Sequence, residues 1–581
     1  MANTDDNGAG APSSQPDWTK AAKRYGPIAA VVALVIGAIA VFGGGGGDDG
    51  DDGPTDAATS GDELILSGPM TPQRAELEGE DPDFGPNCDT DTGRIKLVSI
   101  YAPPCVVPFE GDNGGATYAG VTEDEIKVVY YASDPALDPL TAATISSAGA
   151  NVNPETAAET VAGFVGLYNA LFETYGRTVV VEAYTGTGAG DDVEAARADA
   201  IAIAEMEPFA VIGGPQQASP VFASELASKG IVCGPSCATA LPEEIVEEYE
   251  PYIWQAGPTP DQAASLAAEA IGALAAPGPA ALAGDPALHD QDRVYALLHY
   301  DTPDGDHEGV FQSLKASLAD NGIDLETDIE FTLDLARGQE NARTNITRLK
   351  EAGVTTIIYY GDPLTPGALT QEATAQNYSP EWILGPNLLM DTAIFARLLD
   401  GDQWQHGFGI ALTPARTDRA ESDAWRIWDW AFGGEPPNNT VAVLEPPLRT
   451  IFNGIHLAGP DLNPETFRDA QFRYPITGGV PTAVQVSRGD HGVWPELDWG
   501  GSDDLGIIWW DPEAEGPDEV GNDGIGLYRY ANGGQRYTIG NMPSSPEEAG
   551  LFDVDSSVTI YEELPEGDRA PDYDPPEGFG P

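Results

Sequence analysis

The stretch FAVIGGPQQASPVFASELASKGIVCGPSCAT, residues 209–239, contains a complete strand–helix–strand unit. Phe209–Ile212 is an apolar run too short for a helix and predicts a buried strand. Ser219, followed by proline, favours a helix start, Gly230 favours its end, and the run from Ile231 predicts the next strand. A strand that passes through glycines onto a helix start leaves backbone N–H groups free, which suits an anion or a polar ligand head.

The same alternation continues on both sides of this unit. Strands are expected at 125–131, 178–184, 294–300, 328–332, 355–360 and 382–384, and helices at 153–175, 191–206, 260–275, 307–319, 341–352, 367–377 and 391–399. Strands alternating with helices of this length predict parallel sheets covered by helices on both faces. Since these units are too many for one domain, the predicted fold class is α/β, with two doubly wound parallel-sheet lobes joined by a hinge near 251–260.

After about Leu412 the alternation weakens. Helices are expected at 423–432 and 448–458, and short aromatic strands at 506–510 and 526–530. The predicted organisation is a cytoplasmic tail at 1–24, a transmembrane anchor at 25–43, an acidic Gly-rich tether and lead-in at 44–119, lobe 1 at 120–257 and about 413–478, lobe 2 at 258–412 and about 479–562, and a disordered tail at 563–581.

The N-terminal region predicts export. Three cations, the last of them Arg24, precede the apolar run Tyr25–Phe42, and the acidic run Asp48–Asp52 follows it. The run is longer than the apolar core of a signal peptide and close to the length of a membrane span. The positive-inside rule then places the N-terminus in the cytoplasm and the bulk of the chain outside. An uncleaved anchor is the first interpretation, and a cleaved signal peptide is the alternative.

The charge is strongly acidic, with 27 Lys and Arg against 94 Asp and Glu and a net charge of −67. Nucleic-acid binding requires a basic face, so this composition argues against it. The acids are spread along the exported part, which favours a surface that stays soluble in high salt over a site for a cationic ligand.

Four cysteines allow three disulfide pairings. They are Cys88, Cys105, Cys233 and Cys237. Pairing nearest neighbours joins Cys88 to Cys105 and Cys233 to Cys237. The last two are separated by three residues and have no histidine beside them, which argues against a redox motif and against zinc.

Catalytic and cofactor motifs are absent from the sequence. It has no nucleophile elbow, no phosphate-binding P-loop and no paired zinc histidines. The glycine-rich stretch 186–190 lacks the spacing of a dinucleotide fingerprint and is predicted to be a plain loop. The acidic stretch 301–308 lacks the ligand pattern of a calcium loop. We therefore expect a protein without catalytic residues, metal or cofactor.

Polar residues follow the strands of both predicted lobes. In open α/β sheets, ligands bind at the carboxyl ends of the strands. The candidates in lobe 1 are Gln216, Gln217, Ser219, Ser236 and Thr239, and those in lobe 2 are Tyr300, Asp301, Asp304, Asp362 and Asn387. Two such clusters facing each other across a hinge would form a closing clamp.

Several motifs resemble the type I periplasmic substrate-binding proteins of ABC importers, in the branch of leucine/isoleucine/valine and amide receptors. They are GVTEDEIKVVYY, KGIVCGPSCAT, RVYALLHYDTPDGDHEG, TTIIYYGD and WILGPN, in the family's order. The resemblance covers about 120–412 well and the remainder loosely. It implies a two-lobed solute receptor that works with a permease.

The resemblance also implies ligand contacts. In lobe 1 they fall on Gln216 and Thr239, and in lobe 2 they fall near Thr259, Asp304, Asp362-Pro363 and Asn387. Amino-acid receptors of the family place a serine at the position of Gln216 and acids at those of Thr259 and Asn387. A buried ammonium needs a carboxylate, so an amide, a neutral polar solute or a hydroxylated acid fits this chain better unless Asp304 or Asp362 supplies the charge.

The sequence therefore predicts a monomeric, membrane-anchored, extracytoplasmic solute-binding protein that delivers a small polar solute to an ABC permease. A membrane-anchored sensor working with a signalling partner is the first alternative. A cell-envelope hydrolase is the second, supported only by the aromatic C-terminal part.

Overall fold

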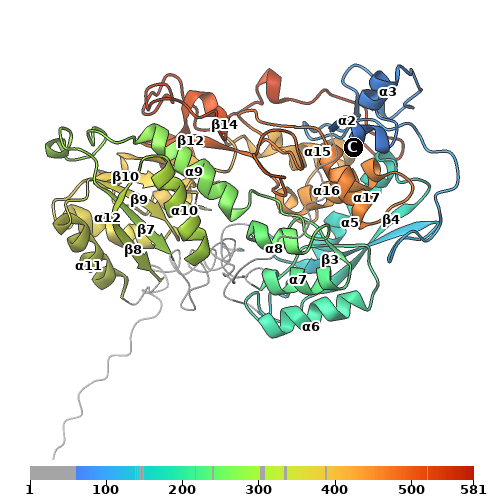
Figure 1. The fold of residues 1–581 in the computed structure, drawn as a ribbon, viewed down its shortest axis with the longest axis horizontal. Helices are drawn as coiled ribbons and strands as arrows, with labels where there is room; N and C mark the ends of the chain where they lie inside the picture. Colours follow the sequence, from blue (N-terminus) through green and yellow to red (C-terminus); the bar gives the residue numbers. More distant parts are fainter. Residues whose placement is uncertain are drawn as a thin grey trace, which may run out of the picture.

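The computed structural model describes residues 61–137, 150–215, 218–238, 241–300, 308–332, 337–386, 389–519 and 521–580, with positions 139, 142 and 146. These residues form two lobes that lie side by side, and the C-terminal part of the chain contributes to both (Figure 1). The predicted tail 1–24 and anchor 25–43 lie outside the described residues. Within the described part, no helix has both the length and the apolar character needed to span a membrane.

Lobe 1 is built on a parallel four-stranded sheet in the order β4-β3-β5-β6. Its strands are β3 (Glu125–Ala132), β4 (Thr178–Thr185), β5 (Ala210–Ile212) and β6 (Val232–Cys233). Its helices are α5 (Pro154–Leu171), α6 (Val193–Ala204), α7 (Ser219–Ser228), α8 (Glu243–Glu248), α15 (Asp423–Phe432), α16 (Val441–Ala458) and α17 (Pro464–Arg473). Helices α5 and α16 pack against each other on one side of the sheet, and α6 and α7 lie on the other (Figure 1).

Lobe 2 is built on a larger sheet in the order β13-β12-β11-β10-β9-β7-β8, with β14 also paired to β12. Its strands are β7 (Tyr295–Tyr300), β8 (Leu325–Phe331), β9 (Thr356–Tyr360), β10 (Glu381–Leu384), β11 (Gly407–Ala411), β12 (Asp504–Pro517), β13 (Asp523–Tyr530) and β14 (Arg536–Thr538). The five strands from β8 to β11 are parallel, whereas β12 pairs antiparallel with β11, β13 and β14.

Two apolar cores cover the two faces of this sheet. Leu297 and Ile358 are neighbours in the ladder and pack into the core that contains α9 and α10, whereas the adjacent Leu298 and Ile357 pack into the core on the other face. Successive strand residues point to opposite faces, so a continuous apolar run is what a sheet covered on both sides requires. The helices are α9 (Pro260–Leu274), α10 (Glu308–Asp320), α11 (Gly338–Glu351), α12 (Thr365–Ala375), α13 (Ala393–Ala396) and α14 (Gly401–Trp404). The predicted α/β class with parallel sheets is confirmed.

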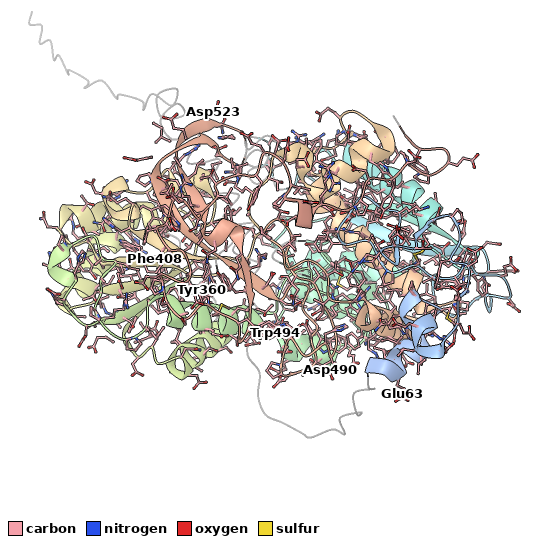
Figure 2. All side chains as sticks on the ribbon, turned by 90° about the horizontal axis from the view of Figure 1, so that it is seen from above. Glu63, Tyr360, Phe408, Asp490, Trp494 and Asp523 are labelled. Atoms are coloured by element: carbon pink, nitrogen blue, oxygen red, sulfur yellow. A yellow bond between two sulfur atoms is a disulfide. The ribbon has the colours of Figure 1, made fainter. Side chains whose placement is uncertain are left out.

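Three connections join the lobes before β12: the first at 254–259, the second at 412–422 and the third at 474–503. After β14 the chain returns to lobe 1, where the C-terminal tail packs. The first follows Ile253, which forms a parallel bridge with Cys233 of β6, and the second follows β11, which is parallel to β10. The chain therefore leaves each lobe from the carboxyl edge of its parallel strands. Seen from above, Trp494 of the third connection lies where the lobes meet (Figure 2).

Two predicted helices differ from the observed ones. Helix α16 begins at Val441 rather than at residue 448, and it includes Pro446 and Pro447. Prolines inside a helix each remove one backbone hydrogen bond. Burial of the apolar residues Leu448 and Phe452 on α16 compensates for this loss. The helix expected at 391–399 is reduced to the four residues of α13.

The lead-in region is more ordered than the sequence predicts. Helices α2 (Gly61–Ser67) and α3 (Pro72–Glu78) occupy a segment expected to be weakly structured. The side chain of Thr71 caps α3, and Arg473 donates to the carbonyl of Leu64 at 2.8 Å. Local capping and one arginine from α17 therefore hold helices too short to be stable alone.

The prediction of a disordered tail from residue 563 is wrong. Trp430 Nε1 donates to the carbonyl of Tyr573 at 2.7 Å, and Phe579 packs edge-to-face on Phe432 at 5.7 Å. The composition of the tail is typical of disorder, but two aromatic residues are enough to attach it to α15.

The structure contains the two disulfides expected from nearest neighbours. Cys88–Cys105 joins the lead-in hairpin of β1 (Cys88–Asp89) and β2 (Arg94–Ile95) to the segment after it, and Cys233–Cys237 closes the turn after β6. Four short 3₁₀ turns complete the described elements: η2 (Pro286–Leu288), η3 (Arg419–Glu421), η4 (Ala531–Gly534) and η5 (Glu566–Asp568).

Candidate functional site

The carboxyl edges of the two parallel sheets define the candidate site. Both connections that leave a parallel sheet start at this edge, so these edges adjoin the passage from one lobe to the other. The loops that follow the strands therefore lie on the side of each lobe where a ligand of an open α/β sheet binds.

In lobe 1, the turns after β5 and β6 are joined to each other. The N–H of Gly213 donates to the Ser236 hydroxyl at 3.1 Å, and a Cβ on Gly214 would lie 2.7 Å from the carbonyl of Cys237. Only glycine fits so close to another backbone. The Cys233–Cys237 disulfide then fixes the loop that carries Ser236. Ser236 is partly exposed and lies on a rigid, preformed edge.

Ser219 has a different role from the predicted one. Ala218 is the N-cap of α7 and no side chain caps the helix, so Ser219 is its first residue rather than its cap. Ser219 is also 99% buried.

In lobe 2, Asp362 follows β9 and is fully buried. Its Oδ1 accepts from the N–H groups of Leu364 and Thr365 at 2.8 and 2.7 Å, and its Oδ2 accepts from the Thr365 hydroxyl at 2.6 Å. Burial raises the pKa of Asp362, and these hydrogen bonds oppose the rise. The carboxylate is therefore already used to begin α12, which leaves it poorly placed to neutralise a ligand ammonium.

Aromatic rings gather at the same edge of lobe 2. Tyr300, at the end of β7, packs edge-to-face on Phe331 at 6.2 Å, and Phe331 stacks on Tyr359 at 5.8 Å. Tyr300 and Phe331 are partly exposed. Tyr300 was among the predicted contacts but Phe331 was not, although an aromatic residue ending a strand was a visible signal.

Thr259 belongs to the first connection and caps α9. Its hydroxyl accepts from the N–H of Gln262 at 3.2 Å, and its own N–H donates to the Gln262 side chain at 2.9 Å. Thr259 is fully buried. The structure therefore gives this residue a capping role, and its predicted contact with ligand stays a prediction.

Asp391 is a buried acid that was not among the predicted contacts. Its Oδ2 accepts from the hydroxyl of Thr413, in the second connection, at 2.6 Å, whereas its buried Oδ1 has no hydrogen-bond partner among the described residues. Burial raises the pKa of Asp391 to about 6. Only tertiary structure brings a residue before α13 to the second connection, so no sequence signal was available.

Asp199 anchors the glycine-rich loop 186–190. It accepts hydrogen bonds from Tyr131, from Tyr184, and from the backbone and hydroxyl of Thr187. An acid in this position would repel a phosphate, which agrees with the predicted plain loop. In the described part of the chain, no group of three or more His, Cys, Asp or Glu side chains is arranged to hold a metal.

The remaining predicted contacts lie outside the described residues. They are Gln216, Gln217, Thr239, Asp301, Asp304 and Asn387. The structure places Ser236 at the edge of lobe 1 and Tyr300 and Asp362 at the edge of lobe 2, as the topology predicts.

No protein-family model matches the chain, and no curated protein matches it. Solved structures of similar fold are solute-binding proteins of ABC transporters. They include a leucine-, isoleucine-, valine-, threonine- and alanine-binding protein from Brucella ovis, at 10% identity, 76% coverage of this chain, 100% of that chain and a TM-score of 0.47.

Two further structures have bound ligands. A solute-binding protein from Rhodopseudomonas palustris HaA2, in complex with p-hydroxybenzoic acid, is 14% identical over 74% of this chain and 100% of that chain, with a TM-score of 0.45. A branched-chain amino acid substrate-binding protein from Streptococcus pneumoniae, in complex with isoleucine, is 11% identical over 70% and 100%, with a TM-score of 0.43. At such identities and TM-scores, the likeness assigns no ligand to this chain.

Proposed function

We propose that this protein is an extracytoplasmic solute-binding protein of an ABC importer and captures a small polar solute between its lobes. The observation that carries the proposal is that the chain leaves both parallel sheets at their carboxyl edges and crosses between the lobes there. Two ligand-binding edges joined by three connections form a clamp that a ligand contacting both lobes would close.

The described edges favour a ligand without a buried ammonium. Asp362 uses both carboxylate oxygens within its own turn, so it offers no free counter-charge. Ser236 offers a hydroxyl on a rigid loop, and Tyr300 and Phe331 offer aromatic surface. Within the predicted amino-acid-like or amide-like class, an amide or a neutral polar solute therefore fits this site best.

The rest of the proposal follows from the sequence. The apolar run at 25–43 would hold the protein in the membrane, with the lobes outside and close to the permease that receives the solute. We infer a monomeric receptor rather than an enzyme, because a clamp that delivers its solute unchanged needs no nucleophile or general base.

The test is a ligand screen on the full-length protein by thermal shift, followed by calorimetry. The panel contains acetamide, propionamide and urea, the amino acids leucine, valine and alanine, and their primary amides. We expect the amides to stabilise the protein more than the matching amino acids. If no compound binds, or if NMR shows that a bound compound is consumed, the proposal is wrong.

A further inference from the structure

A cavity of about 420 Å³ lies between the helices of lobe 1 and the three connections, away from most of the strand ends. Its volume falls within the range of small-molecule sites. Its wall includes Ala256 of the first connection, Pro414–Thr417, Glu421 and Ser422 of the second, and Thr482–Val484, Val486, Arg488 and Gly501 of the third. The wall therefore contains residues from each of the three connections.

Arg426 on α15 lines this cavity with an unpartnered guanidinium. Its side chain is 91% buried. Among the residues that the structure describes, it forms no side-chain hydrogen bond and no ion pair. Burial and the charge of Arg569 lower the pKa of Arg426, whereas Asp423, Glu421 and Asp572 oppose this change. None of these three carboxylates forms an ion pair with it in the described structure, so the guanidinium can still take an acidic partner from outside the chain.

Arg449 on α16 lines the same wall and, unlike Arg426, is fully paired. It donates to Asp423 at 2.8 Å and to the Ser99 hydroxyl at 2.5 Å, and its Nε lies 3.0 Å from Glu445. The chain thus pairs one arginine of the cavity directly with carboxylates, whereas the described carboxylates near the other act on it only at longer range.

Arg488 of the third connection is a second cation without a carboxylate partner in the described structure. It is 95% buried, one of its Nη atoms donates to the carbonyl of Gln255 in the first connection at 2.9 Å, and its Nε has no partner among the described residues. Two acceptors in the wall are also buried and have no hydrogen-bond partner in the part of the chain that the structure describes: Oε2 of Glu445 and Oδ1 of Asn453. Both lie on α16, eight residues apart, a spacing that falls on one helix face.

The charges of the wall differ from those of the whole chain. Its cations are Arg416, Arg426, Arg449 and Arg488, and its acids are Glu421, Asp423, Glu445 and Asp568. The wall thus has equal numbers of cations and acids, whereas the whole sequence has 27 Lys and Arg against 94 Asp and Glu. An anion that the acidic surface repels would therefore meet a locally balanced wall containing two cations that lack a carboxylate.

We propose that this cavity binds a small amphipathic carboxylate that also carries a hydrogen-bond donor. Its carboxylate would pair with Arg426, its donor would satisfy Glu445 or Asn453, and its carbon skeleton would contact the apolar wall formed by Ile100, Pro446 and Val484. The predicted cleft contacts Ser236, Tyr300 and Asp362 are not part of the cavity wall. If the lobes close on a solute as proposed above, occupancy of this site will shift their closing, because its wall includes all three connections.

The test is calorimetry on the full-length protein with two probes, 3-(4-hydroxyphenyl)propionate and 6-hydroxyhexanoate, each beside its primary amide. Inorganic phosphate is tested as well, because it supplies negative charge without a carbon skeleton. We expect the carboxylates to bind at least tenfold more tightly than their amides or phosphate. We expect Arg426→Gln to weaken them at least tenfold, and Val484→Trp, which fills the cavity without removing a charge, to abolish binding.

Arg419→Gln is the matched control, because it removes a nearby cation that is exposed and paired with Glu435. It should bind the probes as the wild type does. Without probe, Arg426→Gln should unfold at the same or a higher temperature, because an unpaired buried charge is lost. Unfolding well below the wild type would show that the guanidinium stabilises the fold and would overturn the proposal.

The proposal would also be wrong if neither carboxylate bound, or if the acids and their amides bound equally well. Loss of probe binding in Gln216→Ala but not in Arg426→Gln would place the probe in the solute cleft instead. Failure of the solute screen would leave the cavity result unaffected, because the two sites are read with different ligands and different variants.

Discussion

The side-chain amide of Gln262 donates a 2.7 Å hydrogen bond to Oδ1 of Asp498. Gln262 also forms the capping box of α9 with Thr259, so one glutamine joins the start of lobe 2 to the third connection. Both partners are buried. The joint between the lobes is thus a polar network, and its hydrogen bonds depend on the protonation of Asp498.

We predict that Asp498→Asn reduces the pH dependence of unfolding. Burial and the neighbouring Asp503 raise the pKa of Asp498 from 3.8 to about 8. Between these values the folded state keeps a proton that the unfolded state has released, so this group's contribution to stability decreases as pH rises and is lost above about 8. Asparagine cannot ionise, so the variant should gain stability relative to the wild type as pH increases, measured by denaturant unfolding from pH 5 to 8.5.

Asp490→Asn is the control for that measurement. Asp490 lies in the same connection and is exposed. The substitution removes the same formal charge as Asp498→Asn, but from an exposed position. The free energy of unfolding of Asp490→Asn should therefore follow that of the wild type across the pH range. Equal pH dependence in Asp498→Asn and wild type would contradict the assignment.

The sequence predicts the parts of the fold that depend on local pattern. The strand of β3 and helix α15 lie at or within one residue of their expected bounds, because short apolar runs and helical periodicity describe burial directly. The start of α16 was missed because Pro446 and Pro447 weaken the local signal, and only the core contacts of Phe452 and its neighbours explain why the helix continues through them.

The sequence predicted that the candidate site lies at the strand ends, but it did not predict what each side chain does there. Asp362 was correctly placed after a strand, yet the sequence could not show that Thr365 and Leu364 use both its oxygens. Arg426 gave no signal at all, since an unpaired guanidinium is recognised only when every neighbour is known.

We predict that the C-terminal tail stabilises lobe 1. Phe579→Ala removes the contact with Phe432 and should lower the free energy of unfolding by about 1–2 kcal/mol, less than a fully buried Phe because Phe579 is partly exposed. Tyr573→Phe loses only the 2.9 Å hydrogen bond to Asp89 and should cost about 1 kcal/mol or less. If Phe579→Ala unfolds at the same temperature as the wild type, the tail does not contribute to the stability of lobe 1.

We predict that molar salt maintains or increases stability. A net charge of −67 makes the folded chain repel itself, and salt screens that repulsion over about 3 Å at 1 M. The melting temperature should therefore hold or rise from 0.1 to 2 M KCl. A steep fall would refute the interpretation of the acidic surface as an adaptation to salt.

We predict that Gln216→Ala and Asn387→Ala weaken binding of the cleft ligand found by the screen. Each removes a polar group expected at one carboxyl edge, so calorimetry should show a loss of roughly tenfold, which corresponds to about 1.4 kcal/mol. Gln376→Ala, on the helical side of lobe 2, is the control and should bind normally. If both cleft variants bind as the wild type does, the assignment of the site is wrong.

Variants of Asp362 distinguish a structural role of its carboxylate from a role in ligand binding. Asp362→Ala leaves the N–H groups of Leu364 and Thr365 without their acceptor, so we expect a loss of about 1–2 kcal/mol in unfolding free energy, as for other helix caps. Asp362→Asn keeps the Oδ1 acceptor and should lose less, while ligand affinity should change by less than about tenfold. Glu351→Ala, an exposed acid of α11, controls for charge. A folded Asp362→Asn variant that no longer binds would show that the carboxylate itself contacts the solute, because the two backbone hydrogen bonds to Oδ1 would remain while the charge would not.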